Sequence, residues 1–355
     1  MTKTLYLFYI SEKTGCLQES ASPKETRDSS SILLGTSLQP AVFLLTGIPG
    51  LEDVHVWISI PLCLMYITSI LGNSLILFII KTDPSIHEPM YIFLSMLAIT
   101  DIGLSISTMP TILGIFLFNS REISHDACFA QLFFIQSLSC IESALLLSMA
   151  FDRYVAICNP LRYASILTLP RVAKMGLVSL LRGVVLRFPL PILLKQFRYC
   201  KDNILSHSYC LHQEVMKMAC SDIRVNSAYG LFVTVSSVGL DSLFILLSYV
   251  MILKAVLSIA SHAERLKALN TCISHVCIVL LFYMPMIGLS VIHRFGKNSS
   301  SFIQIVMSYV YMMAPPLMNP IVYSVKTKQI RARIIRMFIK KKVCSSPGYS
   351  ARNGR

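Results

Sequence analysis

Seven long apolar stretches, separated by short polar segments, constrain the fold of this chain more than any other feature. A helix needs roughly 20 apolar residues to cross the hydrocarbon core of a bilayer, and the stretches are of about that length or longer. They cover residues 57–80, 90–117, 129–157, 172–194, 227–257, 270–292 and 302–324. We therefore expect an all-α membrane protein, folded as a seven-transmembrane helix bundle.

The composition leaves no room for a separate soluble domain. Only 14% of the 355 residues are charged and 54% are hydrophobic, whereas a soluble domain averages about 25% charged residues. We expect an extracellular tail over residues 1–56, the bundle over 57–325, and a cytoplasmic tail over 326–355 with a short amphipathic helix. Residues 1–40 are rich in Ser, Thr and mixed charges, which is typical of a disordered segment.

The net charge of +14 points to membrane lipid as a partner and not to nucleic acid. No basic run alternates with aromatic residues, as a nucleic-acid surface would require. The basic residues gather after the last apolar stretch, at Lys326, Lys328, Arg331, Arg333, Arg336 and Lys340 to Lys342, where they would face anionic cytoplasmic lipid. Basic flanks mark the cytoplasmic side, so we expect the C-terminus inside and, after seven crossings, the N-terminus outside.

An acidic residue and an arginine stand together at the inner end of the third stretch, in the sequence Phe151-Asp152-Arg153-Tyr154. Charges are costly at this depth and usually functional. The alternative is that Arg153 only extends its side chain to the lipid headgroups.

This triplet resembles the olfactory receptor form of the motif in rhodopsin-like G-protein-coupled receptors. Further motifs of that family follow in order, at Gly72-Asn73, Pro89-Met90-Tyr91, Leu97-Ala98, Asp101, Lys267-Ala268, Thr271-Cys272, Ser274-His275 and Pro315 to Tyr323. The segments Gly47 to Glu52, Ser120 to Ser124, Leu205 to Cys210 and Gly288 to Gly296 are similar to class I, or fish-like, olfactory receptors of family 51.

The resemblance implies an odorant receptor without catalytic residues. A small odorant, a carboxylic acid or another oxygenated aliphatic molecule, would bind between the outer ends of the third, fifth and sixth spans. Asp152, Arg153 and Tyr154 would then couple to a heterotrimeric G protein of the stimulatory olfactory type, which raises cyclic AMP. A transporter would need pseudo-symmetric halves, and a membrane enzyme a converging nucleophile and base or a metal set; the sequence shows neither.

The ligand-binding residue of most interest is Arg294, at the outer end of the sixth span. A guanidinium facing an apolar cavity is suited to bidentate binding of a carboxylate, and Ser290 lies one helical turn earlier. The alternative is that Arg294 sits among the outer headgroups. The further expected ligand contacts are Gln136, Ser139, Gln213 and Tyr283.

Four cysteines lie in outer segments, which face an oxidising compartment. The family pattern pairs Cys128 with Cys210. The resemblance also suggests that Cys200 pairs with Cys220, although the sequence leaves open that both stay free.

Three polar residues are expected deep within the bundle, namely Asp101, Glu142 and Asn319. Two neighbouring carboxylates raise at least one pKa or recruit a cation. In the family this centre binds sodium or shares a proton, and a buried hydrogen-bonded network with one protonated carboxyl is the alternative. We expect no other cofactor.

The sequence leaves the roles of several other residues undecided. The spacing of His275, Tyr283 and His293 does not suit a metal site, while His207 and His212 leave a zinc or copper contact open. The outer sequence Asn298-Ser299-Ser300 allows glycosylation at Asn298. Arg187, in the fourth span, either faces a polar cavity or extends toward the interface.

Overall fold

The computed structural model describes residues 42–48, 50–83, 86–199, 203–295 and 301–344. Within them, seven helical segments are long and apolar enough to cross a membrane, which confirms the predicted fold class. They are α2 (His55–Thr82), α3 (Pro89–Phe118), α4 (His125–Cys158), α6 (Leu169–Arg187) with α7 (Pro189–Lys195), α9 (Arg224–Thr234) with η4 (Val235–Gly239) and α10 (Leu240–Leu257), α11 (His262–Phe295), and α12 (Ser301–Lys326).

Most helices extend a few residues beyond their apolar stretches because polar residues can cap or flank a helix. Ser124 caps α4, with its hydroxyl accepting a hydrogen bond from the Ala127 amide at 3.4 Å, a typical N-cap contact. At the end of α3, Asn119 adopts a left-handed backbone with φ of 52°, which Asn tolerates better than most residues.

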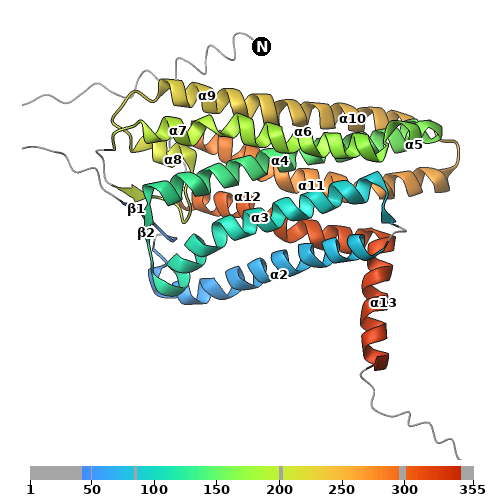
Figure 1. Ribbon diagram of the computed structural model, residues 1–355, viewed down its shortest axis with the longest axis horizontal. Helices are drawn as coiled ribbons and strands as arrows, with labels where there is room; N and C mark the ends of the chain where they lie inside the picture. The colour runs from blue at the N-terminus through green and yellow to red at the C-terminus, as the bar shows by residue number, and fades with distance from the viewer. Residues whose placement is uncertain (1–41, 49, 84–85, 200–202, 296–300, 345–355) are drawn as a thin grey trace, which may run out of the picture. The chain divides into compact units, whose positions relative to one another are not determined.

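A small sheet covers one end of the bundle (Figure 1). Strand β1 (Val42–Leu45) lies between β2 (Glu122–Ser124), with which it is antiparallel, and β3 (Ile204–Leu205), with which it is parallel. The 3₁₀ turn η1 (Glu52–Val54) and the short helix α8 (His212–Lys217) lie near this end. We call it the disulfide end, because the Cys128–Cys210 disulfide lies there.

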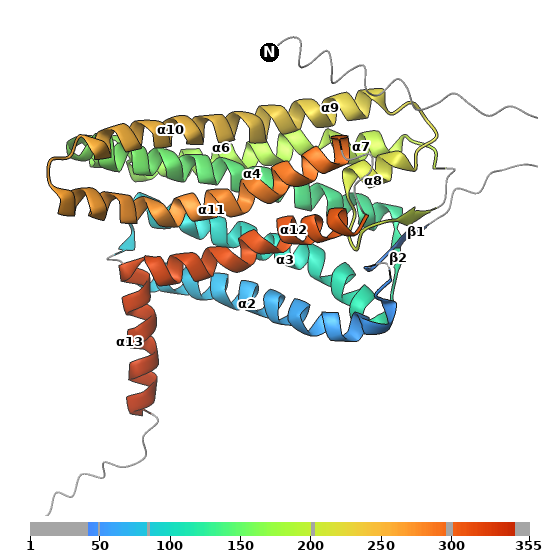
Figure 2. The same cartoon turned by 180° about the vertical axis from the view of Figure 1, so that it is seen from behind.

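The opposite end carries the Asp152-Arg153-Tyr154 triplet, and we call it the Arg153 end. The 3₁₀ turn η3 (Pro160–Arg162) and helix α5 (Tyr163–Ile166) connect α4 to α6 there. The basic helix α13 (Lys328–Cys344) turns away from the direction of α12 (Figure 2). It is anchored by buried Ile330 and by an ion pair between Arg333 and Asp83.

Helix α4 is central, since it contacts α3, α6, α10 and α11. One core cluster lies toward the disulfide end and includes Phe43 and Phe116, and another lies toward the Arg153 end and includes Leu146 and Phe282. Large apolar side chains on the outside remain exposed, as with Trp57 at 72%. An exposed apolar exterior around a buried core is what a lipid solvent requires.

Candidate functional site

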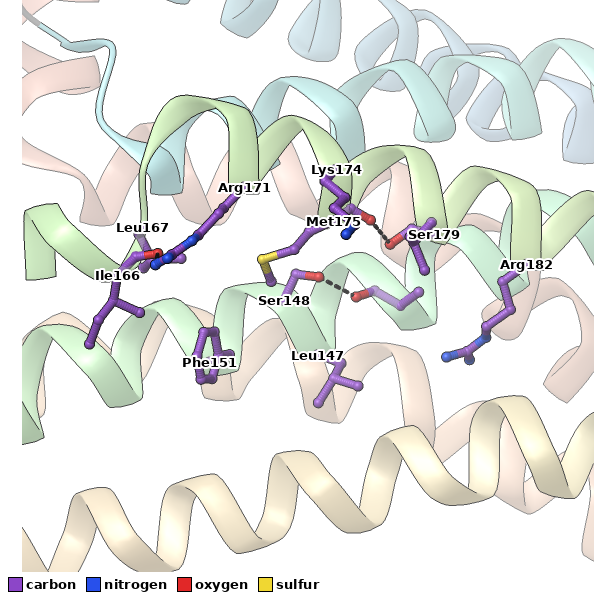
Figure 3. A pocket seen from close by; sticks show the side chains of 12 residues that line it. Leu147, Ser148, Phe151, Ile166, Leu167, Arg171, Lys174, Met175, Ser179 and Arg182 are labelled. Carbon is purple, nitrogen blue, oxygen red and sulfur yellow. Dashed lines mark hydrogen bonds between the residues drawn. The ribbon is translucent and has the colours of Figure 1, made fainter.

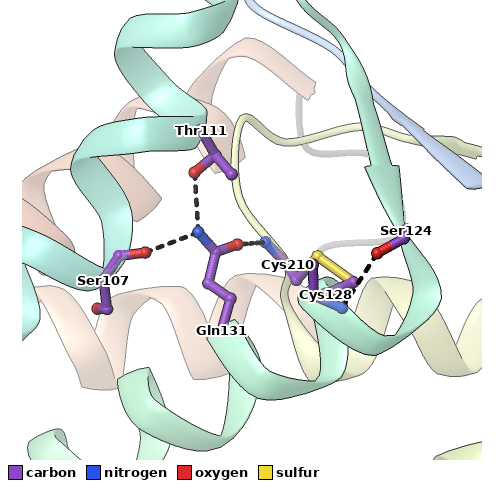
Figure 4. Close-up of a disulfide and its surroundings, with 7 residues drawn as sticks. Ser107, Thr111, Ser124, Cys128, Gln131 and Cys210 are labelled. Carbon is purple, nitrogen blue, oxygen red and sulfur yellow. Dashed lines mark hydrogen bonds between the residues drawn. A yellow bond between two sulfur atoms is a disulfide. The ribbon is translucent and has the colours of Figure 1, made fainter.

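A disulfide joins the start of α4 to the segment before α8. Cys128 and Cys210 are bonded across 82 residues of sequence, which confirms the pairing implied by the resemblance. The Gln131 side chain accepts a hydrogen bond from the Cys210 amide at 2.9 Å and donates to the Ser107 carbonyl and the Thr111 hydroxyl of α3 (Figure 4). Cys210 is thereby bonded to α4 and linked to α3 through the Gln131 side chain.

Cys220 is also disulfide-bonded. Its expected partner, Cys200, lies outside the described residues, so their pairing stays a prediction. Tyr199 forms a β-bridge with Ala219, and the Cys220 amide donates to the Arg198 carbonyl at 2.9 Å. These contacts bring the chain leading to Cys200 beside Cys220.

Helix α8 places His212 inside the protein and leaves Gln213 half-buried. His212 Nε2 lies 3.0 Å from the side-chain oxygen of Asn226, in α9. The pKa of His212 is lowered to about 4, chiefly by burial; the Asn226 hydrogen bond opposes this shift, and the nearby Arg187 charge adds to it. His212 is therefore neutral at physiological pH.

Two predicted ligand contacts on α4 reach neighbouring helices. The Tyr311 hydroxyl of α12 donates to the Ser139 hydroxyl at 2.9 Å. The Gln136 side-chain oxygen accepts a hydrogen bond from Arg187, at the end of α6, at 3.4 Å. Polar groups of α4, α6 and α12 therefore meet in the half of the bundle toward the disulfide end.

The predicted contacts on α11 can be placed by their level along the helix. Tyr283 and Ser143 share a hydrogen bond of 2.8 Å between their hydroxyls, which marks a common level on α11 and α4. Seven residues toward the disulfide end, about 10 Å along each helix, stand Ser290 on α11 and Gln136 on α4. Arg294 follows four residues later in α11, and its side chain lies outside those described.

A buried ion pair between α6 and α10 was missed by sequence reasoning. Asp241, at 1% exposure, accepts hydrogen bonds from Arg182 and, at 2.7 Å, from the Ser143 hydroxyl. Tyr283 joins the same network through Ser143. An acidic residue within an apolar stretch was the available signal, because such residues usually pair inside the bundle.

Asp101, Glu142 and Asn319 are all buried within the bundle. The Asn319 amide donates to Asp101 at 2.9 Å. The other Asp101 oxygen, both Glu142 oxygens and the Asn319 oxygen have no hydrogen-bond partner among the described residues. Four acceptor oxygens therefore lack a donor in this region.

At the Arg153 end, the triplet is closed on itself. Arg153 pairs with the adjacent Asp152 at 2.6 Å, and the Tyr163 hydroxyl of α5 donates to the same carboxylate at 2.7 Å. Tyr154 is half-buried and packs against the cluster of Ile252, Val256 and Cys272. Nearby, the Tyr249 hydroxyl of α10 lies 2.5 Å from His275 of α11.

The profile of the olfactory receptor family matches residues 62–341. The chain belongs to this family. Olfactory receptor 51G2 of Homo sapiens is 67% identical over 298 residues, or 84% of this chain and 95% of the relative. Olfactory receptor 51G1 of Homo sapiens is 62% identical over 307 residues, or 86% of this chain and 96% of the relative.

The fold of this olfactory receptor is also found in a solved structure. The crystal structure of squid rhodopsin matches with a TM-score of 0.67 at 17% identity, over 83% of this chain and 88% of that one. The match shows the seven-helix fold alone. Membership of family 51 makes the chain a multi-pass plasma membrane receptor with an odorant ligand and a G protein partner, and not an enzyme.

The described part of the receptor contains no group of three or more His, Cys, Asp or Glu side chains that could hold a metal ion. His207 and His212 are both buried near the disulfide, and His212 is engaged with Asn226. Asn298 lies outside the described residues, so its glycosylation stays a prediction.

The receptor also has a cavity of about 440 Å³ away from the predicted ligand contacts. Side chains of α4, α5 and α6 line it, including Leu147, Phe151 and Met175 (Figure 3). The lining is largely apolar, and it adjoins lipid-facing positions such as Val178, which is 53% exposed. We place no odorant there, because the hydroxyls of Ser148 and Ser179 already donate to their own helices and Arg182 is paired with Asp241. An oxygenated ligand needs convergent polar groups to orient it.

Proposed function

We propose that the receptor detects small carboxylic acids and responds by activating a stimulatory G protein, which raises cyclic AMP. The observation that carries this proposal is the convergence of polar side chains toward the disulfide end. Gln136 and Ser290 stand at one level, Ser139 is about one turn away, and Gln213 lies in α8 just after the disulfide. Other oxygenated aliphatic molecules are the alternative ligands.

Arg294 is the first candidate to bind the acid. It lies in α11 one turn beyond Ser290, toward the disulfide end. A guanidinium can hold a carboxylate through two parallel hydrogen bonds. Tyr283 lies about 10 Å deeper, where its hydroxyl already bonds to Ser143, so we expect it to act through the helix network.

The disulfide end is proposed to face the cell exterior, and the Arg153 end the cytoplasm. Disulfides persist in oxidising compartments, and Cys128, Cys210 and Cys220 are all bonded. Basic residues favour the cytoplasmic side, and α13 is rich in lysine and arginine.

Activation is proposed to separate α11 from α4 at the Arg153 end. In the described state, Asp152 holds Arg153, and the contact between Tyr249 and His275 holds α10 against α11. An odorant shifts this equilibrium only by binding the open state more tightly. Opening would free Asp152, Arg153 and Tyr154 to contact the G protein.

The polar centre is proposed to hold a sodium ion. Asp101, Glu142 and Asn319 present four buried oxygens without a donor, and hard cations prefer oxygen ligands. The shared-proton network is the alternative, since protonating one carboxyl also removes the repulsion.

The acid-sensing proposal is tested by replacing Arg294→Ala in cells that report cyclic AMP. Loss of a hydrogen bond to a charged group should raise the acid concentration for half-maximal response by about 10- to 100-fold, with surface expression unchanged. Arg224→Ala is the matched control, because Arg224 also lies at the disulfide end and its side chain is 79% exposed. Equal acid responses in Arg294→Ala and wild type would exclude this ion pair.

A further inference from the structure

Arg187 is a buried guanidinium without a carboxylate partner among the described residues. It is 7% exposed, and no ion pair involves it within that part of the chain. Its hydrogen bonds to Gln136 and to the Ser237 hydroxyl are long, at 3.4 and 3.3 Å, and its Nε has no partner. A buried charge is destabilising unless it is paired and well hydrogen-bonded.

The buried acidic side chains of the bundle are either bonded to other groups or stand at another level along their helix, and Glu214 of α8 is paired with Lys217. Asp241 is held by Arg182 and Asp101 by Asn319. Glu142 stands six residues beyond Gln136 on α4, about 9 Å along the helix. No carboxylate in the described region is therefore placed to neutralise Arg187.

None of the groups that face Arg187 among the described residues is an Asp or Glu side chain. Those in electrostatic contact with its guanidinium are Cys140 of α4, Tyr311 of α12, Tyr229 of α9 and His212 of α8. This polar surrounding provides hydrogen bonds for a ligand but no carboxylate to pair with Arg187.

Two irregular segments build this surrounding. Helix α6 ends at Arg187, just before the turn at Phe188 that precedes Pro189, and the Tyr229 hydroxyl donates to the Leu186 carbonyl at 3.0 Å. On the facing span, the π-helical segment η4 places the fully buried Ser237 against Arg187. π-helical turns are rare and occur frequently at functional sites.

The level of Arg187 coincides with that of the predicted odorant contacts. It contacts Gln136, which stands at about the level of Ser290 and eight residues from Cys128 on α4, or about 12 Å inward along the helix. A ligand bound between these residues would therefore meet the guanidinium.

We propose that Arg187 binds the carboxylate of a small aliphatic acid inside the bundle, between α4, α6, η4 and α12. The carboxylate replaces the two long bonds to Gln136 and Ser237 with a charge-assisted, bidentate pair. This inference rests on the proposed detection of acids but not on Arg294, which stands nearer the disulfide end. The unpaired charge of Arg187 therefore destabilises the unliganded receptor, and binding of an acid relieves this destabilisation.

The first test compares two arginines of the same helix in the purified, unliganded receptor. Arg187→Gln removes an unpaired buried charge and should raise the Tm by a few degrees. The reason is that a group kept for ligand binding destabilises the unliganded receptor. The matched control Arg182→Gln leaves Asp241 unpaired and should lower Tm. A lower Tm for Arg187→Gln would indicate a structural role and overturn the proposal.

The second test measures cyclic AMP responses to straight-chain fatty acids and to their methyl esters. Arg187→Gln should weaken the acid response by at least about 10-fold and change any ester response little, whereas Arg187→Lys should retain part of the acid response. An acid response in Arg187→Gln equal to wild type overturns this inference and leaves the proposed function standing. A wild type that responds to esters but not to acids also overturns it.

A direct binding measurement tests the proposal even if the cells give no cyclic AMP response. A fatty acid should raise the Tm of purified wild-type receptor and not that of Arg187→Gln, because a ligand stabilises only the state it binds. Equal shifts in both proteins would overturn the role of Arg187. A shift confined to wild type, with no cyclic AMP response, would support this role and contradict the proposed coupling instead.

Discussion

At the scale of single residues, the buried ionisable side chains differ in whether their atoms have hydrogen-bond partners. Asp101 and Glu142 each have carboxylate oxygens without a donor, whereas Asp241 is satisfied by Arg182 and Ser143. Both kinds of group lie at similarly low exposure. The unsatisfied ones are therefore the places where we propose that an ion or a proton binds.

The sodium proposal gives a prediction at this scale. The purified receptor should have a higher Tm in sodium chloride than in choline chloride of equal ionic strength, because sodium would bind the folded state alone. Asp101→Asn should abolish the difference, while Ser95→Ala, a half-buried position of α3 that bonds only its own helix, should preserve it. Identical Tm values for wild type in both salts would favour the proton-sharing network.

At the scale of elements, hydropathy predicted the seven spans. The irregular elements around the proposed ligand contacts depend instead on contacts between residues far apart in the sequence. The strands β1, β2 and β3 have two to four residues each and come from distant segments. No local sequence pattern therefore predicts them. The break of α6 at Phe188 could be suspected from Pro189. The π-helical segment η4 and the contact between Ser237 and Arg187 could not.

Particular site residues show the same division. The pairing of Cys128 with Cys210 followed from family motifs and is confirmed. The environment of Arg187 depends on three other spans and remained open in the sequence. Asp241 was visible as an acidic residue in an apolar stretch, but its partner Arg182 lies 59 residues away, and nothing local connects them.

Helix α8 gives a prediction of pH dependence. The pKa of His212 is lowered by burial from 6.5 to about 4, so the unfolded chain binds the proton more readily between these values. Stability should fall as pH drops from 6.5 toward 4, by up to about 1.4 kcal/mol per pH unit. The stability curve of His212→Gln should be flatter over this range by that amount, and parallel curves would contradict the assignment.

At the scale of the whole molecule, the proposed ligand contacts lie in one half of the bundle and the proposed signalling residues lie in the other. Arg187 and Gln136 meet toward the disulfide end, while Arg153 and Asp152 pair at the opposite end. Helix α4 contributes to both regions and contacts α3, α6, α7, α10 and α11. Odorant detection outside the cell can drive a cytoplasmic response only if these two ends face opposite sides of the membrane.

Labelling of the two chain termini tests this arrangement most directly. Epitope tags at the N- and C-termini are probed with antibodies in intact and in permeabilised cells that express the receptor. We predict that the N-terminal tag is labelled in intact cells and the C-terminal tag only after permeabilisation. Labelling of both tags in intact cells, or of neither, would place the termini on one side and contradict the receptor mechanism.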